Sequence, residues 1–109
     1  MSTPYVERGL TVMAWRISGA QGLNTIDVFW WDGSIGVGTV TITCFDRAWS
    51  AYFGAMGKTI RQFFAEADTD YLTTKLGLTT LLKCRKRDLA YLAKIIDAIK
   101  AELNREGAA

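Results

Sequence analysis

Histidine is absent from this sequence, and proline and cysteine are scarce. The chain has no histidine, one proline and two cysteines. The lack of histidine excludes Ser-His-Asp and Cys-His catalysis, histidine-ligated metal sites and a histidine pH switch. Cys44 and Cys84 lie 40 positions apart and form no Cys-x-x-Cys pattern. We therefore expect two free thiols in a reducing cytosol, and neither a disulfide framework nor a thiolate metal site.

A strong charge of one sign and a long apolar run are also missing. The 109-residue chain has 13 basic and 11 acidic residues, which leave a formal net charge of +2. A balance this even does not by itself indicate nucleic-acid binding. The longest uncharged stretch, residues 33–45, has 13 residues, whereas a membrane span needs about 20 apolar residues. Residues 1–8 contain no signal-peptide h-region. These features predict a soluble, cytoplasmic protein without membrane contact.

The first half of the chain has the character of strands. Half of all residues are hydrophobic, and the length suits one domain that spans residues 1–109. The predicted strands, rich in β-branched and aromatic residues, cover residues 10–17, 25–31, 35–46 and 47–53. Turns are expected at Asp32-Gly33 and at Asp46-Arg47. Such short links between consecutive strands favour an antiparallel meander.

The hydrophobic period changes to that of helices after Gly57. Thr59 and Gln62 have the spacing of a capping box, in which each side chain bonds the backbone of the other residue. This spacing predicts a short helix that starts beside Thr59. Asp68 is placed to cap a second short helix, which we expect to end at Gly77.

The last helix has the clearest pattern. Its apolar residues recur at steps of three and four and include Leu92, Ile96 and Ile99. Asp88 is a suitable N-cap for a helix that starts at Leu89. The predicted fold class is α+β. It comprises a four-stranded antiparallel meander sheet over about residues 9–55, then two short helices and one long C-terminal helix over about 59–106, packed on one face.

Aromatic side chains on the predicted strands are the first functional candidates. Because neighbours on a strand point to opposite faces, Trp30 and Trp31 cannot both face the helices. The face without helices is then expected to expose large aromatics, which marks an interaction surface. The alternative is that loops or the N-terminal segment cover this face. The candidate partner-binding residues are Trp30, Trp31, Trp49 and Tyr52.

A basic run before the last helix is the second candidate. Four of the five residues 83–87 are positively charged, and such a cluster can contact phosphates. The candidate nucleic-acid-binding residues are Lys83, Arg85, Lys86 and Arg87. The alternative is a solvated loop, presented outward just before the helix that Asp88 caps.

An acidic cluster is the third candidate. Glu66, Asp68 and Asp70 lie close together in the sequence, and carboxylates bind Mg²⁺ or act as acid and base. The simpler interpretation is structural, since Asp68 and Asp70 suit the positive end of the second short helix. We favour the structural interpretation and expect no cofactor and no metal.

Residues 44–57 resemble a block found in a family of small bacteriophage and prophage proteins. The block has the form Cys-aromatic-x-x-x-Trp-x-Ala-Tyr-aromatic-Gly-x-Met-Gly, and it occurs here from Cys44 to Gly57. The resemblance extends over about residues 38–103. It implies a phage accessory gene product of the kind that binds host proteins, including defence machinery such as CRISPR complexes or nucleases. It transfers no catalytic residue to this chain.

These observations favour a non-enzymatic phage accessory protein in the host cytoplasm. It is expected to bind a host protein or complex through aromatic side chains and to inhibit or redirect it. A host defence complex and a second copy of the chain are the partners considered. A small nucleic-acid-binding protein that uses residues 83–87 is the alternative function. A metal-dependent enzyme whose site is formed by the acidic cluster is the least favoured hypothesis.

Overall fold

Four strands followed by three helices make up the part of the chain that the structure describes. This computed structural model describes residues 4, 6, 12–20, 22–33, 36–78 and 86–106, without the side chains of residues 78, 86, 87 and 106. The elements are β1 (Met13–Ile17), β2 (Ile26–Asp32), β3 (Gly38–Cys44), β4 (Arg47–Phe53), α1 (Ile60–Glu66), α2 (Thr69–Leu78) and α3 (Lys86–Glu106). The predicted α+β class is confirmed.

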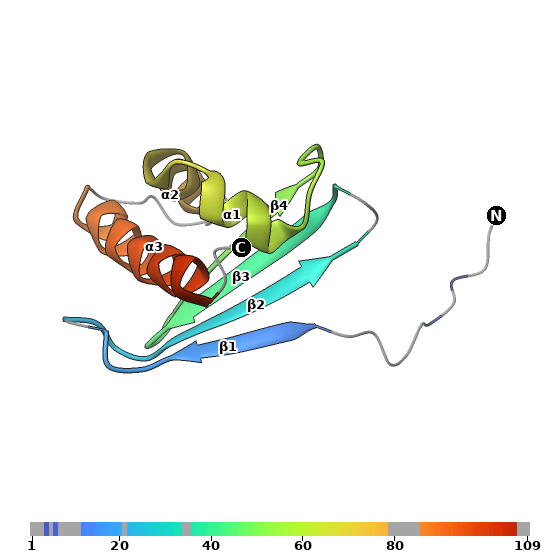
Figure 1. Cartoon of the computed structure of the whole chain (residues 1–109). Coiled ribbons are helices and arrows are strands. Elements are labelled where there is room, and N and C mark those ends of the chain that lie inside the picture. The colour runs from blue at the N-terminus through green and yellow to red at the C-terminus, as the bar shows by residue number, and fades with distance from the viewer. Residues whose placement is uncertain are drawn as a thin grey trace.

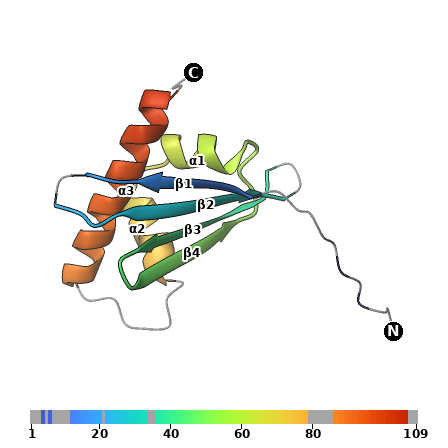
Figure 2. The same ribbon diagram turned by 90° about the horizontal axis from the view of Figure 1, so that it is seen from below.

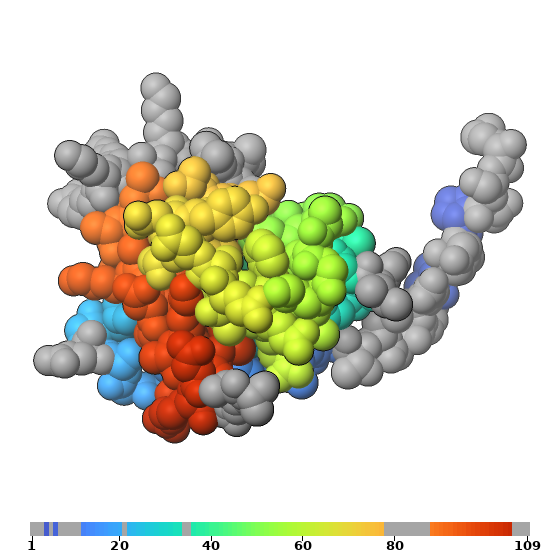
Figure 3. Space-filling model, turned by 45° about the horizontal axis from the view of Figure 1, so that its top comes forward, coloured from blue at the N-terminus to red at the C-terminus, as the bar shows by residue number. Residues whose placement is uncertain are grey.

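The strands form one antiparallel meander in the order β1-β2-β3-β4. All three helices lie on the same side of this sheet (Figure 1). The view from below places the sheet in front of the helices, so that the face turned to the reader carries no helix (Figure 2). On the opposite side the atoms of the helices fill most of the surface (Figure 3). Helices therefore cover one face of the sheet, and none of the described helices lies on the other face.

The core lies between the covered face and the helices. Alternate residues of β2 and β3, such as Val28, Val40 and Ile42, point into it and are fully buried. The helices contribute Phe64 from α1 and the predicted stripe of α3. Leu92, Ile95, Ile96 and Ile99 in that stripe have no exposed surface. The helical periodicity of the sequence thus identified the packing face of α3 correctly.

Side-chain caps join the sheet to the first helix. The predicted capping box is present. The backbone amide of Gln62 donates to Thr59 Oγ1 (3.2 Å), and the backbone amide of Thr59 donates to Gln62 Oε1 (3.3 Å). A long-range cap accompanies it, because Asp32 at the end of β2 accepts a hydrogen bond from the Ile60 amide at 2.8 Å. This contact positions α1 over the end of β2.

Two predicted boundaries are wrong in ways that have physical causes. The last helix begins at Lys86 instead of Leu89, so Asp88 lies within its first turn and is not the N-cap. There the Asp88 carboxylate accepts a hydrogen bond from Arg47 at 2.7 Å. The turn before β4 comprises Phe45 and Asp46, and not Asp46 and Arg47, because Cys44 and Arg47 form the last pair of the ladder.

The remaining boundaries differ less. β3 is shorter than residues 35–46 and covers Gly38–Cys44. α2 continues through the buried Gly77 to Leu78. β1 begins at Met13, whereas the start predicted at residue 10 lies outside the described residues. Cys44 is a buried free thiol, as expected, and Cys84 lies outside the described residues.

Removal of side-chain volume from the α3 stripe should destabilise the fold. Ile96 is fully buried, so Ile96→Ala is expected to lower the free energy of unfolding by about 2–5 kcal/mol. Lys94 lies on the exposed side of the same helix, and Lys94→Ala should change it by less than about 0.5 kcal/mol. Urea denaturation followed by circular dichroism measures both. Equal stability of the two variants would show that the stripe is not core.

Candidate protein-binding surface

The sheet face opposite the helices is the candidate surface, and we call it the open face. The strand register brings its side chains into three rows that run across the sheet. The first row holds Trp31, Thr39 and Tyr52, the middle row holds Ala14, Phe29, Thr41 and Ser50, and the third row holds Arg16, Asp27, Thr43 and Ala48. Residues from all four strands therefore contribute to one continuous surface.

Three aromatic side chains gather in the first two rows of the open face. Trp31 is 38% exposed, Phe29 is 39% exposed and Tyr52 is 57% exposed. Trp31 and Tyr52 stand on either side of Thr39, because β3 lies between β2 and β4. Phe29 lies two residues before Trp31 on the same strand, so both rings project from the same face. The three rings thus lie in two adjacent rows of the open face, and we call them the aromatic cluster.

Four polar side chains on the open face form two pairs with one another. Arg16 donates two hydrogen bonds to the Asp27 carboxylate, at 2.8 and 3.2 Å, across β1 and β2. The hydrogen bond from Arg16 lowers the pKa of Asp27, and the same contact raises the pKa of Arg16. The Thr41 and Ser50 hydroxyl groups share a hydrogen bond of 3.0 Å across β3 and β4. The two charges that the open face carries are therefore neutralised by each other.

The predicted partner-binding residues divide between the two faces of the sheet. Trp31 and Tyr52 lie on the open face, whereas Trp30 and Trp49 are only 2% and 4% exposed and belong to the core. The Trp30 ring makes edge contacts with Trp15 and Phe64, with centroids 5.5 and 5.2 Å apart. Trp30 and Trp49 cannot reach a partner on the open face, so the candidate set is reduced to Trp31 and Tyr52, with Phe29 added.

The predicted nucleic-acid-binding run lies mainly beyond the described residues. Lys83 and Arg85 fall outside them. Lys86 and Arg87 form the start of α3, and not a loop before it, but their side chains are outside the description. The run therefore adds no described side chain to the candidate surface.

The acidic cluster has structural partners. Glu66 forms an ion pair with Lys58. At the start of α2, the backbone carbonyl of Asp68 accepts a hydrogen bond of 3.0 Å from the backbone amide of Leu72. Asp70 lies in the first turn of α2, where a negative charge is favourable. Among the described residues, no group of three or more Cys, Asp or Glu side chains is arranged to hold a metal ion.

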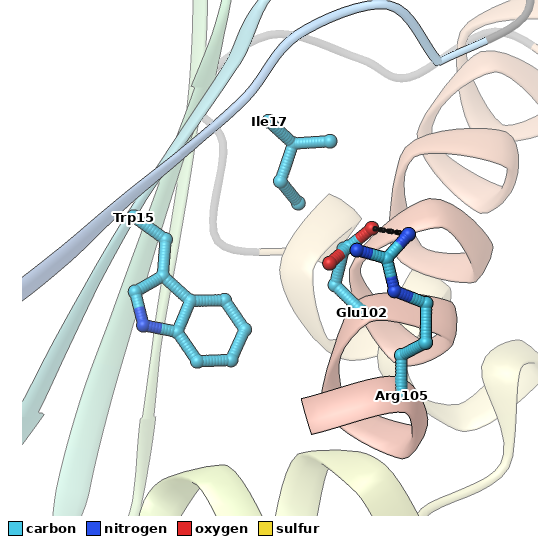
Figure 4. A pocket seen from close by; sticks show the side chains of 4 residues that line it. All are labelled: Trp15, Ile17, Glu102 and Arg105. Carbon is cyan, nitrogen blue, oxygen red and sulfur yellow. Dashed lines mark ion pairs between the residues drawn. The ribbon is translucent and has the colours of Figure 1, made fainter. Parts of the chain in front are cut away.

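A hollow of about 300 Å³ lies on the helical side, between β1 and the end of α3. Figure 4 shows the Trp15 indole and Ile17 facing the Glu102–Arg105 ion pair across this hollow. The two charged side chains stand 3.3 Å apart, one helical turn from each other, and Arg105 is largely exposed. The hollow thus combines an apolar wall with an ion pair at its rim and contains no nucleophile beside a base among its described residues.

The turn between β3 and β4 contains a feature that the sequence analysis missed. Phe45 has a φ of 60° and is 79% exposed. A positive φ at only the first position of a two-residue hairpin turn is typical of a type II′ turn, which prefers glycine there. A bulky residue in this conformation is strained by about 1–2 kcal/mol. The sequence signal for this strain is that the two-residue turn, Phe45-Asp46, contains neither glycine nor asparagine.

Contacts with α3 hold this turn in place from both sides. Arg47 pairs with Asp88 at 2.7 Å, and the Cys44 thiol shares a hydrogen bond of 3.2 Å with the Tyr91 hydroxyl. This hydrogen bond, together with burial, raises the pKa of Tyr91. On its other side Phe45 borders a hollow with Arg16, Asp27 and Thr43 of the open face. Phe45 therefore stands at the edge of the candidate surface.

Relief of this strain should stabilise the protein. Phe45→Gly removes about 1–2 kcal/mol of backbone strain from the folded state. Glycine also gives the unfolded chain more conformational entropy, which lowers the stability by about 0.5–1 kcal/mol. We expect the free energy of unfolding to rise by roughly 0.5–1 kcal/mol, measured by urea denaturation. Asp46→Gly is the control, because Asp46 is not in the positive-φ region and its replacement should give no gain. A loss of stability in Phe45→Gly would mean that the ring makes contacts that outweigh the strain.

The two adjacent tryptophans should respond differently to truncation. Trp30→Ala opens a cavity in the core and is expected to cost about 3–5 kcal/mol. Trp31→Ala, at an exposed position of the same strand, should cost roughly 1 kcal/mol or less. Thermal denaturation followed by circular dichroism compares the two variants with the parent. Similar losses in both would show that the open face is covered in the monomer.

Comparison with known proteins indicates the origin of the chain. A family model described as a phage family, Phage_phiTE_072, matches residues 6–82. This range includes the whole sheet, α1 and α2. No curated protein and no solved structure matches the chain. None of the described helices is long and apolar enough to cross a membrane. The chain belongs to the Phage_phiTE_072 family of phage proteins.

Proposed function

We propose that this phage protein is a non-enzymatic accessory protein that binds a host protein through its open face and inhibits or redirects it. A host defence assembly, such as a CRISPR or nuclease complex, is the candidate target, and the host cytoplasm is the proposed place of action. The observation that supports binding is the cluster of Phe29, Trp31 and Tyr52 on a face without helices.

The composition of the open face suits the centre of a protein interface. Interface centres are depleted in charged residues and enriched in Trp, Tyr and Phe. Among the described residues of the three rows, the charged side chains are Arg16 and Asp27, which neutralise each other in the third row. The Thr39 hydroxyl lies between Trp31 and Tyr52, and the Thr41 and Ser50 hydroxyl groups lie in the row of Phe29. Such groups can donate or accept hydrogen bonds.

The rigidity of the open face favours binding as well. Trp31 is flanked along β2 by Trp30 and Asp32, whose side chains are held by the core and by the α1 cap respectively. A side chain on such a support loses little conformational freedom when a partner binds. We propose contact rather than catalysis because the three rows of the open face offer exposed aromatic area and hydroxyl groups for hydrogen bonds.

Affinity capture with matched variants tests this proposal. The tagged parent chain, Trp31→Ala and Tyr52→Ala are each incubated with host lysate, and retained proteins are identified by mass spectrometry. The identified protein is then purified, and its dissociation constant is measured for each variant. Loss of an aromatic anchor typically costs about 2 kcal/mol or more, which weakens binding roughly 30-fold. Tyr71→Ala is the control, since Tyr71 is an exposed aromatic on α2.

Two results would contradict the proposal. If every variant retains the purified protein with the affinity of the parent, the open face is not the contact surface. If the parent binds short DNA or RNA at low salt, and only the combined change of Arg85, Lys86 and Arg87 to Ala reduces that binding and its salt dependence, the nucleic-acid alternative replaces it.

A further inference from the structure

The open face is complementary to a second copy of itself. We propose that in the free protein two chains pair through their open faces in a reversible two-fold dimer, which a host partner must displace. This inference rests on the proposed function only in assigning the open face to protein contact. A second copy of the chain would occupy the open face before the host protein does.

The charges of the open face do not oppose its pairing with a second copy. A two-fold interface brings the same surface of both copies together, so any unpaired charge near its centre meets a like charge. The chain as a whole carries a net charge of +2, but Arg16 and Asp27 on the open face are joined by two hydrogen bonds. The remaining residues of the three rows are uncharged. Two open faces can therefore approach without like-charge repulsion between their rows.

Large and small side chains are distributed over the open face so that two copies can fit together. A two-fold axis that runs across the strands through the middle row places the first row of each copy over the third row of the other. Tyr52 then lies over the small Ala48, and Trp31 lies over the Arg16–Asp27 pair, whose flat guanidinium group suits an aromatic ring. In the middle row Phe29 meets its own counterpart. The large residues of one copy thus face small or flat groups of the other.

The area of the open face is sufficient for a small interface. Four strands spaced about 4.8 Å apart, with up to seven residues at about 3.3 Å each, give a plan of roughly 19 by 23 Å. When the relief of the side chains is included, two such faces bury on the order of 1,000 Å², the lower limit of specific interfaces. Aligned packing of sheets about 10 Å apart is a standard arrangement for such faces. This area predicts a weak dimer that exchanges readily.

Self-association and partner binding then exclude each other. Trp31 and Tyr52 cannot contact a second copy and a host protein at the same time. The dimer would keep the aromatic cluster out of water while the protein is free, because a monomer with such a patch tends to associate nonspecifically. The host protein would bind the monomer, and dimer formation would lower its apparent affinity as the protein concentration rises.

Sedimentation velocity of the purified full chain, from low to high micromolar concentration, tests the proposal. The parent should show a monomer–dimer equilibrium. Ala48→Lys and Trp31→Lys should raise the dimer dissociation constant at least tenfold, since each places a charge at the two-fold interface. Ala48 is small and exposed on its strand, so its variant keeps the core intact if Trp31→Lys fails to fold. Tyr71→Lys on α2 is the control and should dimerise as the parent does.

The outcomes separate this inference from the proposed function. A parent chain that stays monomeric throughout overturns the dimer, while capture of a host protein by Trp31 and Tyr52 would still stand. A dimer that persists in Ala48→Lys and Trp31→Lys but dissociates in Tyr71→Lys also overturns it. A dimer that behaves as expected, together with affinity for a purified host protein that no open-face variant alters, contradicts the proposed function and the displacement by a host partner, while the dimer itself stands.

Discussion

The burial of one sheet face under α1, α2 and α3 is the constraint on which the other features depend. Because side chains alternate along a strand, the burial of Val40 and Ile42 forces Thr39 and Thr41 to the opposite face. A shift of one residue in the register would exchange the two sets and expose the core. The composition of the open face is thus tied to the same register that builds the core.

Side-chain contacts between distant segments keep this two-layer arrangement in place. Asp32 caps α1 from the end of β2, and Arg47 ties the β3–β4 hairpin to α3 through Asp88. On the helical side Thr69 donates to Asp97, and Lys100 donates to the carbonyl of Ala67 between α1 and α2. The sheet that carries the open face is therefore held by side-chain contacts with the helices on its other side. Such a surface needs little reorganisation when it binds.

The aromatic cluster and the strained turn are both unfavourable for the isolated fold. Phe29, Trp31 and Tyr52 expose apolar area, and Phe45 adopts a conformation that glycine would adopt without strain. Natural proteins tolerate such departures mainly where binding requires them. The aromatic cluster lies on the open face, and Phe45 lies at the edge of that face. The open face and its neighbouring turn therefore carry features that the stability of the fold alone does not favour.

The sequence by itself determined the α+β class, the meander, the capping box at Thr59 and the apolar stripe of α3, because each depends on residues close together in the chain. It also required Trp30 and Trp31 to point in opposite directions. Only the tertiary structure decided which of them is buried, since local alternation treats both faces alike. Asp88 shows the same limit: its local pattern predicted an N-cap, whereas its ion pair joins it to Arg47, 41 residues away. Contacts of this kind depend on how distant segments pack, and no local pattern encodes them.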